Sequence, residues 1–376
     1  MDGYQIGLVS VYDTGTADGT PQIQSSLAEW HVRGNISRSF EKKGFRISLY
    51  TERGKANDVD FLGIRSDDDW MLDAMYYTPE WPPEFYRSRH LKEMLVDELW
   101  EQLRQRENSP NAIASSRYLE LVLNGEYLGL YLMRSKIDAK LEKIDRNADI
   151  IFKCSTKNGN KLTNSDWTSL SEGDEVLACI SLEFYPGDTM GAWETIRPFL
   201  QVLVQTDMKL DGLTADEVIE MVDLNNQIDN ALMVNCLEMH DNMAPTNNII
   251  YVYRKEEGKY YRLFWDFDLN LTDLPDIGGV NVKDECIYTQ EIERLMELDR
   301  SVWPAMCARW RALREDIFTE ANIAEILNRA QRQLDLSGVW EREQARWPNE
   351  LLDLDGNVHL TEIVRNRLAF LDAYYQ

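Results

Sequence analysis

The first 50 residues alternate between apolar and polar positions with the period of two that is typical of strands. The apolar runs GLVSVY and AEWHVRG are followed by FRISLY, in which every second residue from Phe45 to Leu49 is apolar. β-branched and aromatic residues are frequent in these runs, as they are in strands generally. We therefore predict that the chain begins with a β-rich region.

Two later segments have the pattern of β-hairpins. In YLELVLNGEYLGLYLM, residues 118–133, Asn124 and Gly125 can adopt the positive φ angles of a type I′ turn. The runs IIYVY and YYRLFW flank a second turn at residues 256–259. The first hairpin is so densely apolar that we expect its sheet to be buried on both faces.

A helical pattern begins at Glu84. Its apolar stripe consists of Leu91, Met94, Leu95, Leu99 and Leu103. The acids Glu93, Asp97 and Glu98 lie on the opposite face, where we expect contact with solvent. This segment is predicted to be one long amphipathic helix.

More helices are predicted in the second half of the chain. Residues 193–205 and 215–240 have amphipathic patterns, and the second is expected to break near Asp223. After Asp268 the chain is mostly helical in pattern. Together with the strands, these helices indicate an α+β fold.

The segment RSKIDAKLEKID follows the first hairpin and has the composition of a connection between two parts of a protein. We therefore predict a β-rich N-terminal lobe at residues 1–138 and a mostly helical C-terminal lobe at residues 139–376. A chain of 376 residues is long enough for two such lobes.

The net charge of the chain argues against several kinds of partner. Lys and Arg number 40 and Asp and Glu number 65, which gives a net charge of −25. Phosphate backbones and anionic membranes would be repelled, so we expect no nucleic-acid partner. No apolar run is long enough to span a bilayer, and MDGYQIGLVS lacks the pattern of a signal peptide, so we expect a soluble chain without membrane insertion. The five cysteines show no metal or disulfide spacing.

Polar residues cluster at both ends of the second hairpin. Asp241, Asn247 and Asn248 precede it, and Asp266 and Asp268 follow it. An antiparallel hairpin returns the chain to its starting edge, so we expect these side chains to converge there. Carboxylate and amide oxygens suit a hard cation such as Mg²⁺.

A second candidate segment is RGNISRSFEKKG, which leads into the predicted strand FRISLY. Gly34 would let backbone amides approach a phosphate, and Lys42, Lys43 or Arg46 would supply positive charge. Taken alone, this pattern also fits an ordinary surface loop.

The chain lacks the motifs of several enzyme classes. It has no GxSxG and no HExxH, and its four histidines are scattered, which leaves carboxylates as candidate catalysts. Glycosidases use two carboxylates across a sugar bond, whereas phosphoryl transfer uses one to orient the nucleophile and others to bind metal. The lysines and amides favour phosphoryl transfer. The order of Asp241, Asn247 or Asn248, and Asp266-Phe267-Asp268 also matches protein kinases, with D-F-D in place of D-F-G.

Four segments together resemble one family of atypical kinases. They are RGNISRSFEKKGFRISLY, LVLNGEYLGLYLMRSKID, the loop from Asp241 to Asn248, and FWDFDLN. The resemblance is to the spore coat protein H (CotH) kinase family, whose members have R-G-N-x-S before paired lysines, an N-G-x-Y-x-G-x-Y hairpin, and W-D-x-D. It extends from about Arg33 to Asn270, and NRLAFLD near the end of the chain also fits.

The resemblance implies a two-lobed atypical protein-kinase-like fold and an ATP-dependent Ser/Thr protein kinase. Asp241 would orient the substrate hydroxyl. Asp266 would be the main ligand of Mg²⁺ or Mn²⁺, and Asp268 would assist it together with Asn247 or Asn248.

The resemblance also implies a set of ATP-binding residues before residue 50: Arg33, Gly34, Asn35, Lys42, Lys43 and Arg46. Lys43 would touch the phosphates, with Lys42 or Arg46 as substitutes, and the first three residues would shape the loop over them. Residues 132–136 would pass the adenine, although Ser135 stands where the family usually has a glutamate.

Two other functions are compatible with the same residues. The chain could be a non-catalytic protein of the spore coat or cell surface that keeps the kinase fold for binding, or a glycosidase with paired carboxylates. For the kinase, we expect a protein substrate, Ser-rich or basic because the chain is acidic. The family resemblance suggests a bacterial protein of the spore surface, the cell surface or the secreted fraction. The oligomeric state is not indicated.

Overall fold

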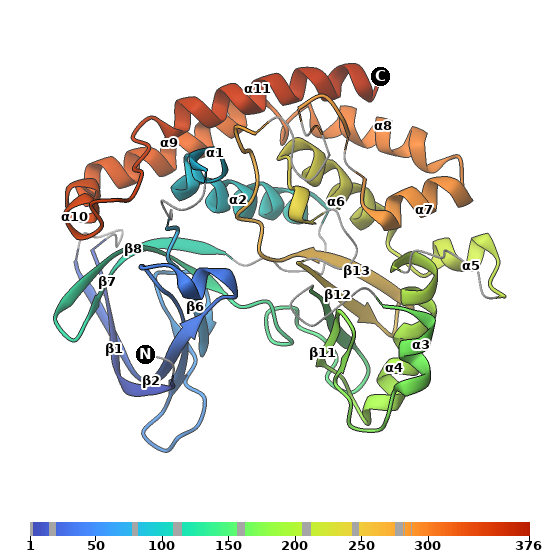
Figure 1. The fold of residues 1–376 in the computed structure, drawn as a ribbon, viewed down its shortest axis with the longest axis horizontal. Coiled ribbons are helices and arrows are strands. Elements are labelled where there is room, and N and C mark those ends of the chain that lie inside the picture. The colour runs from blue at the N-terminus through green and yellow to red at the C-terminus, as the bar shows by residue number, and fades with distance from the viewer. Residues whose placement is uncertain are drawn as a thin grey trace. The chain divides into compact units, whose positions relative to one another are not determined.

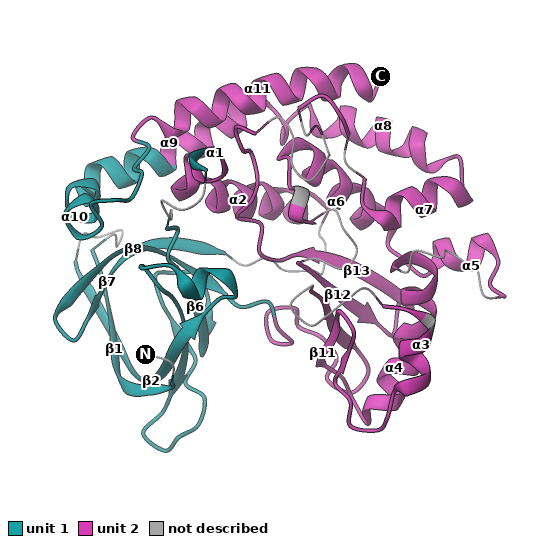
Figure 2. Ribbon diagram, in the orientation of Figure 1, with its two compact units in different colours: residues 1–83, 113–137, 330–353 teal, residues 84–112, 138–329, 354–376 magenta. Residues whose placement is uncertain are grey.

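The computed structural model describes residues 3–14, 20–76, 82–107, 115–155, 162–204, 212–242, 248–274, 281, 283–286 and 288–376. The fold is α+β, as predicted (Figure 1). Contacts divide the chain into two compact units (Figure 2). Unit 1 comprises residues 1–83, 113–137 and 330–353, and unit 2 comprises residues 84–112, 138–329 and 354–376.

Unit 1 is built on a six-stranded antiparallel sheet, which is strongly curved in Figure 1. In spatial order its strands are β1 (Gln5–Asp13), β2 (Gln22–Arg33), β3 (Gly44–Tyr50), β6 (Asp69–Asp73), β8 (Glu126–Ser135) and β7 (Ser116–Leu123). The shorter elements are η1 (Ile36–Ser39), β4 (Val59–Asp60), β5 (Ser66–Asp67) and α10 (Val339–Arg346). The alternation in β3 turns Phe45 and Leu49 into the core, where they join Trp70 and Tyr131.

The β7–β8 hairpin has the predicted turn, because both Asn124 and Gly125 have positive φ angles, of 53° and 84°. The expected burial on both faces holds for the second half of β8, whose last seven residues are all buried. It is wrong for β7, where Val122 is 57% exposed. β7 is an edge strand of the sheet, and exposed residues recur along it between half-buried ones.

Each unit consists of segments that are far apart in the chain and contact one another. A cut falls between residues 137 and 138, next to the boundary expected from the sequence. Residues 330–353, however, belong to unit 1, because α10 and the residue after it bind the β7–β8 hairpin. The Trp347 indole N–H donates to the Leu128 carbonyl at 2.9 Å, and Arg346 donates to the Tyr127 carbonyl at 2.9 Å.

Unit 2 contains a five-stranded sheet with the order β10 (Val176–Leu177), β11 (Ile180–Phe184), β9 (Ile150–Cys154), β12 (Ile249–Arg254) and β13 (Lys259–Phe264). Its first helical elements are α2 (Arg89–Glu107), α3 (Asn164–Ser169), α4 (Thr189–Phe199), η3 (Leu200–Val204), α5 (Ala215–Glu220), α6 (Leu224–Cys236) and η4 (His240–Asn242). The later helices are α7 (Gln290–Leu298), α8 (Val302–Leu313) and α11 (Gly356–Tyr374). Two helices, α1 (Pro83–Tyr86) and α9 (Glu320–Ser337), extend across the unit boundary.

Asp223 separates α5 from α6, where the sequence predicted a break. Its side chain accepts a hydrogen bond from the Asn226 N–H at 2.8 Å and so caps the start of α6. Aromatic rings from four elements pack together: Phe199 of α4 stacks on Tyr260 of β13, with ring centroids 4.3 Å apart, and Phe152 of β9 stacks on Tyr251 of β12. The second predicted hairpin is therefore fixed to the core of unit 2.

The helix α2 is more deeply buried than its sequence suggested. Glu93 and Asp97 are only 2% and 3% exposed, so their expected contact with solvent is wrong. The rest of the protein covers other faces of α2 besides its apolar stripe, because His90 and Lys92 are buried as well.

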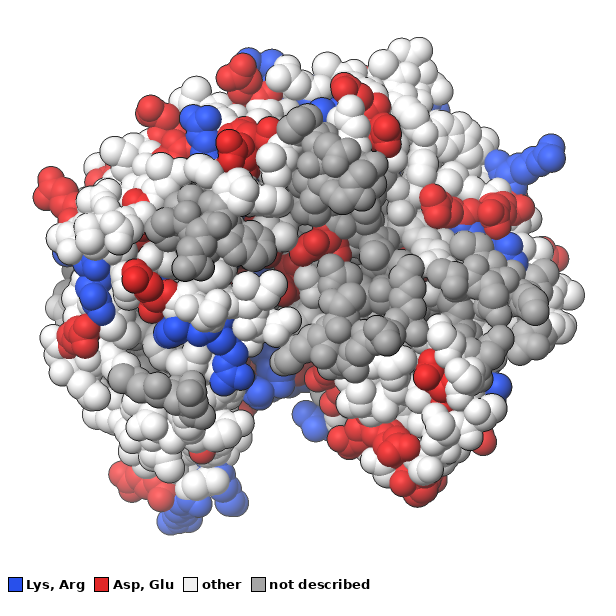
Figure 3. Space-filling model, in the orientation of Figure 1, with Lys and Arg blue, Asp and Glu red and all other residues white. Residues whose placement is uncertain are grey.

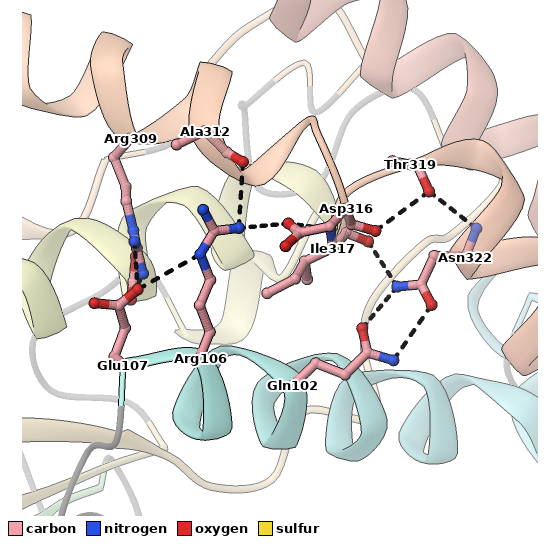
Figure 4. Close-up of polar contacts among 10 residues, drawn as sticks. Gln102, Arg106, Glu107, Arg309, Ala312, Asp316, Ile317, Thr319 and Asn322 are labelled. Atoms are coloured by element: carbon pink, nitrogen blue, oxygen red, sulfur yellow. Dashed lines mark hydrogen bonds and ion pairs between the residues drawn. The ribbon is translucent and has the colours of Figure 1, made fainter.

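The C-terminal end of α2 binds the start of α9 and the segment between α8 and α9 (Figure 4). Gln102 and Asn322 exchange amide hydrogen bonds of 2.7 and 3.3 Å, and Arg106 pairs with Asp316. These contacts hold α2 against other helices of unit 2.

Charged side chains of both signs are interspersed on the face shown in Figure 3. None of the helices in the described ranges combines the length and the apolar character needed to cross a membrane. None of the five cysteines forms a disulfide.

Candidate functional site

The acidic part of the candidate site begins where α6 ends. Glu238 has a φ of 52°, which stops the helix and turns the chain into the short element η4. Its buried carboxylate pairs with Lys283 at 2.6 Å. Asp241 is the middle residue of η4.

Asn242 joins both ends of the β12–β13 hairpin to η4. Its side-chain N–H groups donate to the carbonyls of Asn248 and Trp265, both at 3.0 Å. Its own carbonyl accepts from the buried guanidinium of Arg262. The sequence analysis did not single out Asn242, although its position directly after Asp241 was the available signal.

The two acids after β13 have different surroundings. Asp266 is exposed and has a φ of 56°. Its main-chain carbonyl accepts a hydrogen bond of 3.5 Å from the side-chain amide of Asn248. Asp268 is half-buried and pairs with Arg89 of α2 at 3.0 Å. Asn247 lies outside the described residues. Four of the five predicted residues thus lie in the described part of unit 2, before and after one hairpin.

Like charges lie close together in this part of the site. Burial and, to a lesser extent, the negative charge of Asp268 together raise the pKa of Asp241 to about 6. Both effects oppose ionisation of Asp241, and a bound cation would reverse the second. The donor set, which consists of carboxylate and amide oxygens, fits Mg²⁺ or Mn²⁺.

The α2 helix contributes cations beside these acids. Lys92 is fully buried, and burial lowers its pKa to about 7, against the opposing influence of Asp273. Its ammonium donates to the Phe85 carbonyl at 3.2 Å. Sequence reasoning missed Arg89 and Lys92 because nothing in a helical pattern shows which of its charged residues will be buried.

The loop residues Arg33, Gly34 and Asn35 lie in unit 1 between β2 and η1. Gly34 has a φ of 110°, and a Cβ on it would be 2.0 Å from the Ser37 hydroxyl oxygen. Only glycine fits this position, as expected for a loop that must turn tightly.

The three candidate cations of unit 1 have different partners. Lys43 donates to the carbonyls of Arg38 and Phe40, at the end of η1. Arg46 forms a two-pronged ion pair with Asp69, at 2.8 Å for its Nε. Lys42 pairs with Glu343 of α10.

Residues 132–135, the predicted adenine segment, lie in β8 and are buried. Lys136 follows them and is 3.4 Å from Asp69. The predicted phosphate and adenine segments are therefore all parts of unit 1.

One lobe contains a sheet with lysines, and the other contains an acidic turn followed by a hairpin and two acids. An α+β chain with these features has a two-lobed protein-kinase-like fold. The sequence profile of one family, described as CotH kinase protein, matches residues 30–371. This match covers most of the chain, so the protein belongs to the CotH kinase family, and the resemblance found in the sequence is confirmed. None of the curated proteins matches the chain.

Proposed function

We propose that this protein transfers the γ-phosphoryl group of ATP to Ser or Thr hydroxyls of a protein substrate. Membership of the CotH kinase family supports a kinase-like activity in general. The observation that carries the proposal is the pair Asp241 and Asp268: Asn242 fixes η4, which contains Asp241, to the hairpin that precedes Asp268, and the charge of Asp268 acts on the pKa of Asp241. Such a pair suits a site that binds a divalent cation and accepts a proton.

In the proposed reaction, Asp241 accepts a hydrogen bond from the substrate hydroxyl and aims its oxygen at the γ-phosphorus. The new oxygen–phosphorus bond forms while the bond from the γ-phosphorus to the bridging oxygen breaks. ADP leaves with that electron pair, and the hydroxyl proton passes to Asp241. A carboxylate whose pKa lies near 6 accepts a proton more readily than an ordinary aspartate does.

Asp266 and Asp268 would hold Mg²⁺ or Mn²⁺, with an oxygen from Asn247 or Asn248. When bound, the metal neutralises negative charge on the phosphate oxygens. The clamp made by Asn242 supports these roles, because it fixes η4 to both ends of the hairpin that carries the ligands.

Cations of unit 1 would bind the ATP phosphates. The loop formed by Arg33, Gly34 and Asn35 would cover them, and Lys42, Lys43 or Arg46 would supply the charge. The tight turn at Gly34 supports this role, since backbone amides in such turns bind anions.

The substrate is proposed to be a Ser-rich or basic protein, because the chain has a net charge of −25. Attraction between exposed charges weakens as salt is added. The KM for a basic Ser-containing peptide should therefore rise with ionic strength, and an unchanged KM would remove the argument for a basic substrate.

The test is incubation of the full chain with γ-labelled ATP and Mg²⁺ or Mn²⁺, alone and with a basic Ser-rich peptide. We expect label on the protein or peptide, and loss of labelling in Asp266→Ala. Asp216→Asn, an exposed acid on α5, is the matched control and should label normally. Absence of labelling, of an ATP-dependent rise in melting temperature, and of any effect of Asp266→Ala would refute the kinase. A melting shift without labelling would favour the non-catalytic binding protein.

A further inference from the structure

Lys42 and Glu343 form a buried ion pair within unit 1. Lys42 lies just before β3, and Glu343 lies in α10, 301 residues later in the chain. Both side chains are 0% exposed. Each charge of the pair compensates the other in a position that solvent does not reach.

The carboxylate of Glu343 is itself held in place by the backbone. Its second oxygen accepts from the Leu130 N–H of β8 at 2.7 Å. At Gly129, where φ is 108°, a Cβ would lie 2.4 Å from that oxygen, so only glycine leaves room for it. The Lys42 ammonium also lies over the Tyr131 ring, 5.0 Å from its centroid.

The segment that supplies Glu343 is anchored on both sides of that residue. The Arg342 guanidinium binds Glu120 at 2.7 and 2.8 Å. Four residues beyond Glu343, the Trp347 ring packs edge-on against Tyr76, with centroids 5.5 Å apart. These contacts give Glu343 a fixed position relative to the sheet.

The other candidate cations of unit 1 are used differently. Lys43 donates to main-chain carbonyls and thereby closes η1, which is a local structural role. Arg46 shares Asp69 with Lys136. Only Lys42, among these three candidates, has a dedicated carboxylate that is fixed by the backbone of the neighbouring strand.

We propose that Glu343 is the residue that positions Lys42 for the phosphates of ATP, so that α10 is part of the nucleotide site. This inference rests on the proposed kinase function and selects one phosphate-binding cation from the three. Protein kinases hold their ATP lysine with a glutamate from a helix that follows the lysine strand closely. In this chain the glutamate comes from a helix more than 300 residues later.

The first variant that tests the inference is Glu343→Gln, with Glu341→Gln as the matched control because it is an exposed acid on the same helix. We expect the KM for ATP to rise about tenfold in Glu343→Gln with a smaller change in kcat, because the lysine is misplaced before the chemical step. Binding of a fluorescent ATP analogue should weaken by a similar factor. Glu341→Gln should leave both values unchanged.

Loss of one partner can also unfold a protein, so a second variant separates stability from function. Lys42→Met with Glu343→Leu removes both charges, and such apolar replacements of buried ion pairs are often neutral or stabilising. We expect this double variant to melt close to the wild type and yet to lose ATP binding.

Three outcomes are distinguishable. If the wild type neither binds ATP nor transfers phosphate, the proposed function fails. If the wild type is active and the folded double variant binds ATP equally well, the pair is purely structural and the inference is overturned. If the double variant is folded and does not bind ATP while Glu341→Gln does, the inference holds.

Discussion

The two units differ in how their buried and half-buried charges are arranged. In unit 1, Lys42 and Glu343 bring opposite charges together in a fully buried pair. In unit 2, Asp241 and Asp268 bring like charges together at the ends of a hairpin. The ammonium of Lys42 opposes the rise that burial causes in the pKa of Glu343, whereas the charge of Asp268 adds to the rise that burial causes in the pKa of Asp241.

This difference assigns different tasks to the two regions. A compensated pair has a fixed geometry, so it suits a group that must be positioned before a ligand arrives. Of the two neighbouring carboxylates, Asp268 already pairs with Arg89, and a bound cation would offset the repulsion that remains between them, so they suit a metal site. Removal of the Glu343 charge should therefore destabilise unit 1, whereas removal of the Asp241 charge should stabilise the metal-free form of unit 2.

The largest expected effect is that of Asp241→Asn on activity. Loss of a general base should reduce phosphorylation about 10² to 10⁴-fold. The same change should raise the stability of the metal-free protein. The pKa of Asp241 is raised in the fold, so its contribution to stability is present below about pH 4 and is lost as the pH rises through about 6.

Labelling assays and thermal unfolding with a chelator at pH 4 and pH 7.5 test this prediction. The melting temperatures of wild type and Asp241→Asn should agree at pH 4, and the variant should melt higher at pH 7.5. A variant that is less stable than the wild type at pH 7.5 would show that like charges do not control this region.

The second prediction concerns the opposite-charge region and uses Gly129→Ala. Alanine there must adopt a φ of 108° and would displace the Glu343 carboxylate. We expect a loss of about 3 kcal/mol in unfolding free energy, from backbone strain together with the weakened ion pair. ATP binding should weaken as well.

The hairpin turn supplies a matched control. Gly125 has a φ of 84° but has open space where its Cβ would lie. Gly125→Ala should therefore cost only about 1 kcal/mol, from the backbone alone, and should not affect ATP binding. Equal losses in denaturant unfolding of the two variants would mean that Glu343 contributes nothing at this position.

Only part of the contrast between the two regions could be predicted from the sequence. Local patterns predicted the hairpins, the turn at Asn124-Gly125, the break at Asp223 and the acids at both ends of β12–β13, because each depends on neighbouring residues. The kinase order of those acids came from motif spacing. The roles assigned to the site residues remain predictions.

Partners from distant segments could not be predicted. Arg89 meets Asp268 across 179 residues, and Glu343 meets Lys42 across 301 residues. A glutamate in a surface-like amphipathic helix gives no local sign that it will be buried. Only the docking of α10 on the β7–β8 hairpin makes Glu343 a partner for the lysine.

The smallest expected effect is that of replacing Lys92. Its buried ammonium donates to a main-chain carbonyl, that of Phe85, whereas the ammonium of Lys42 pairs with a carboxylate. Burial lowers the pKa of Lys92 to about 7 in the fold, whereas the unfolded chain binds the proton up to about pH 10.4. The wild type should therefore gain stability as the pH rises from about 7 toward 10, since the unfolded state holds more protons in that range.

Lys92→Met removes this dependence. The variant should exceed the wild type in stability by about 1 to 2 kcal/mol at pH 6, and the advantage should shrink toward pH 9. Lys255→Met, at an exposed position, should show no such trend. Denaturant unfolding across this pH range checks the prediction. If Lys92→Met destabilises the protein equally at pH 6 and pH 9, the neighbouring acids compensate Lys92 fully, and this cation then behaves like the paired lysine of unit 1.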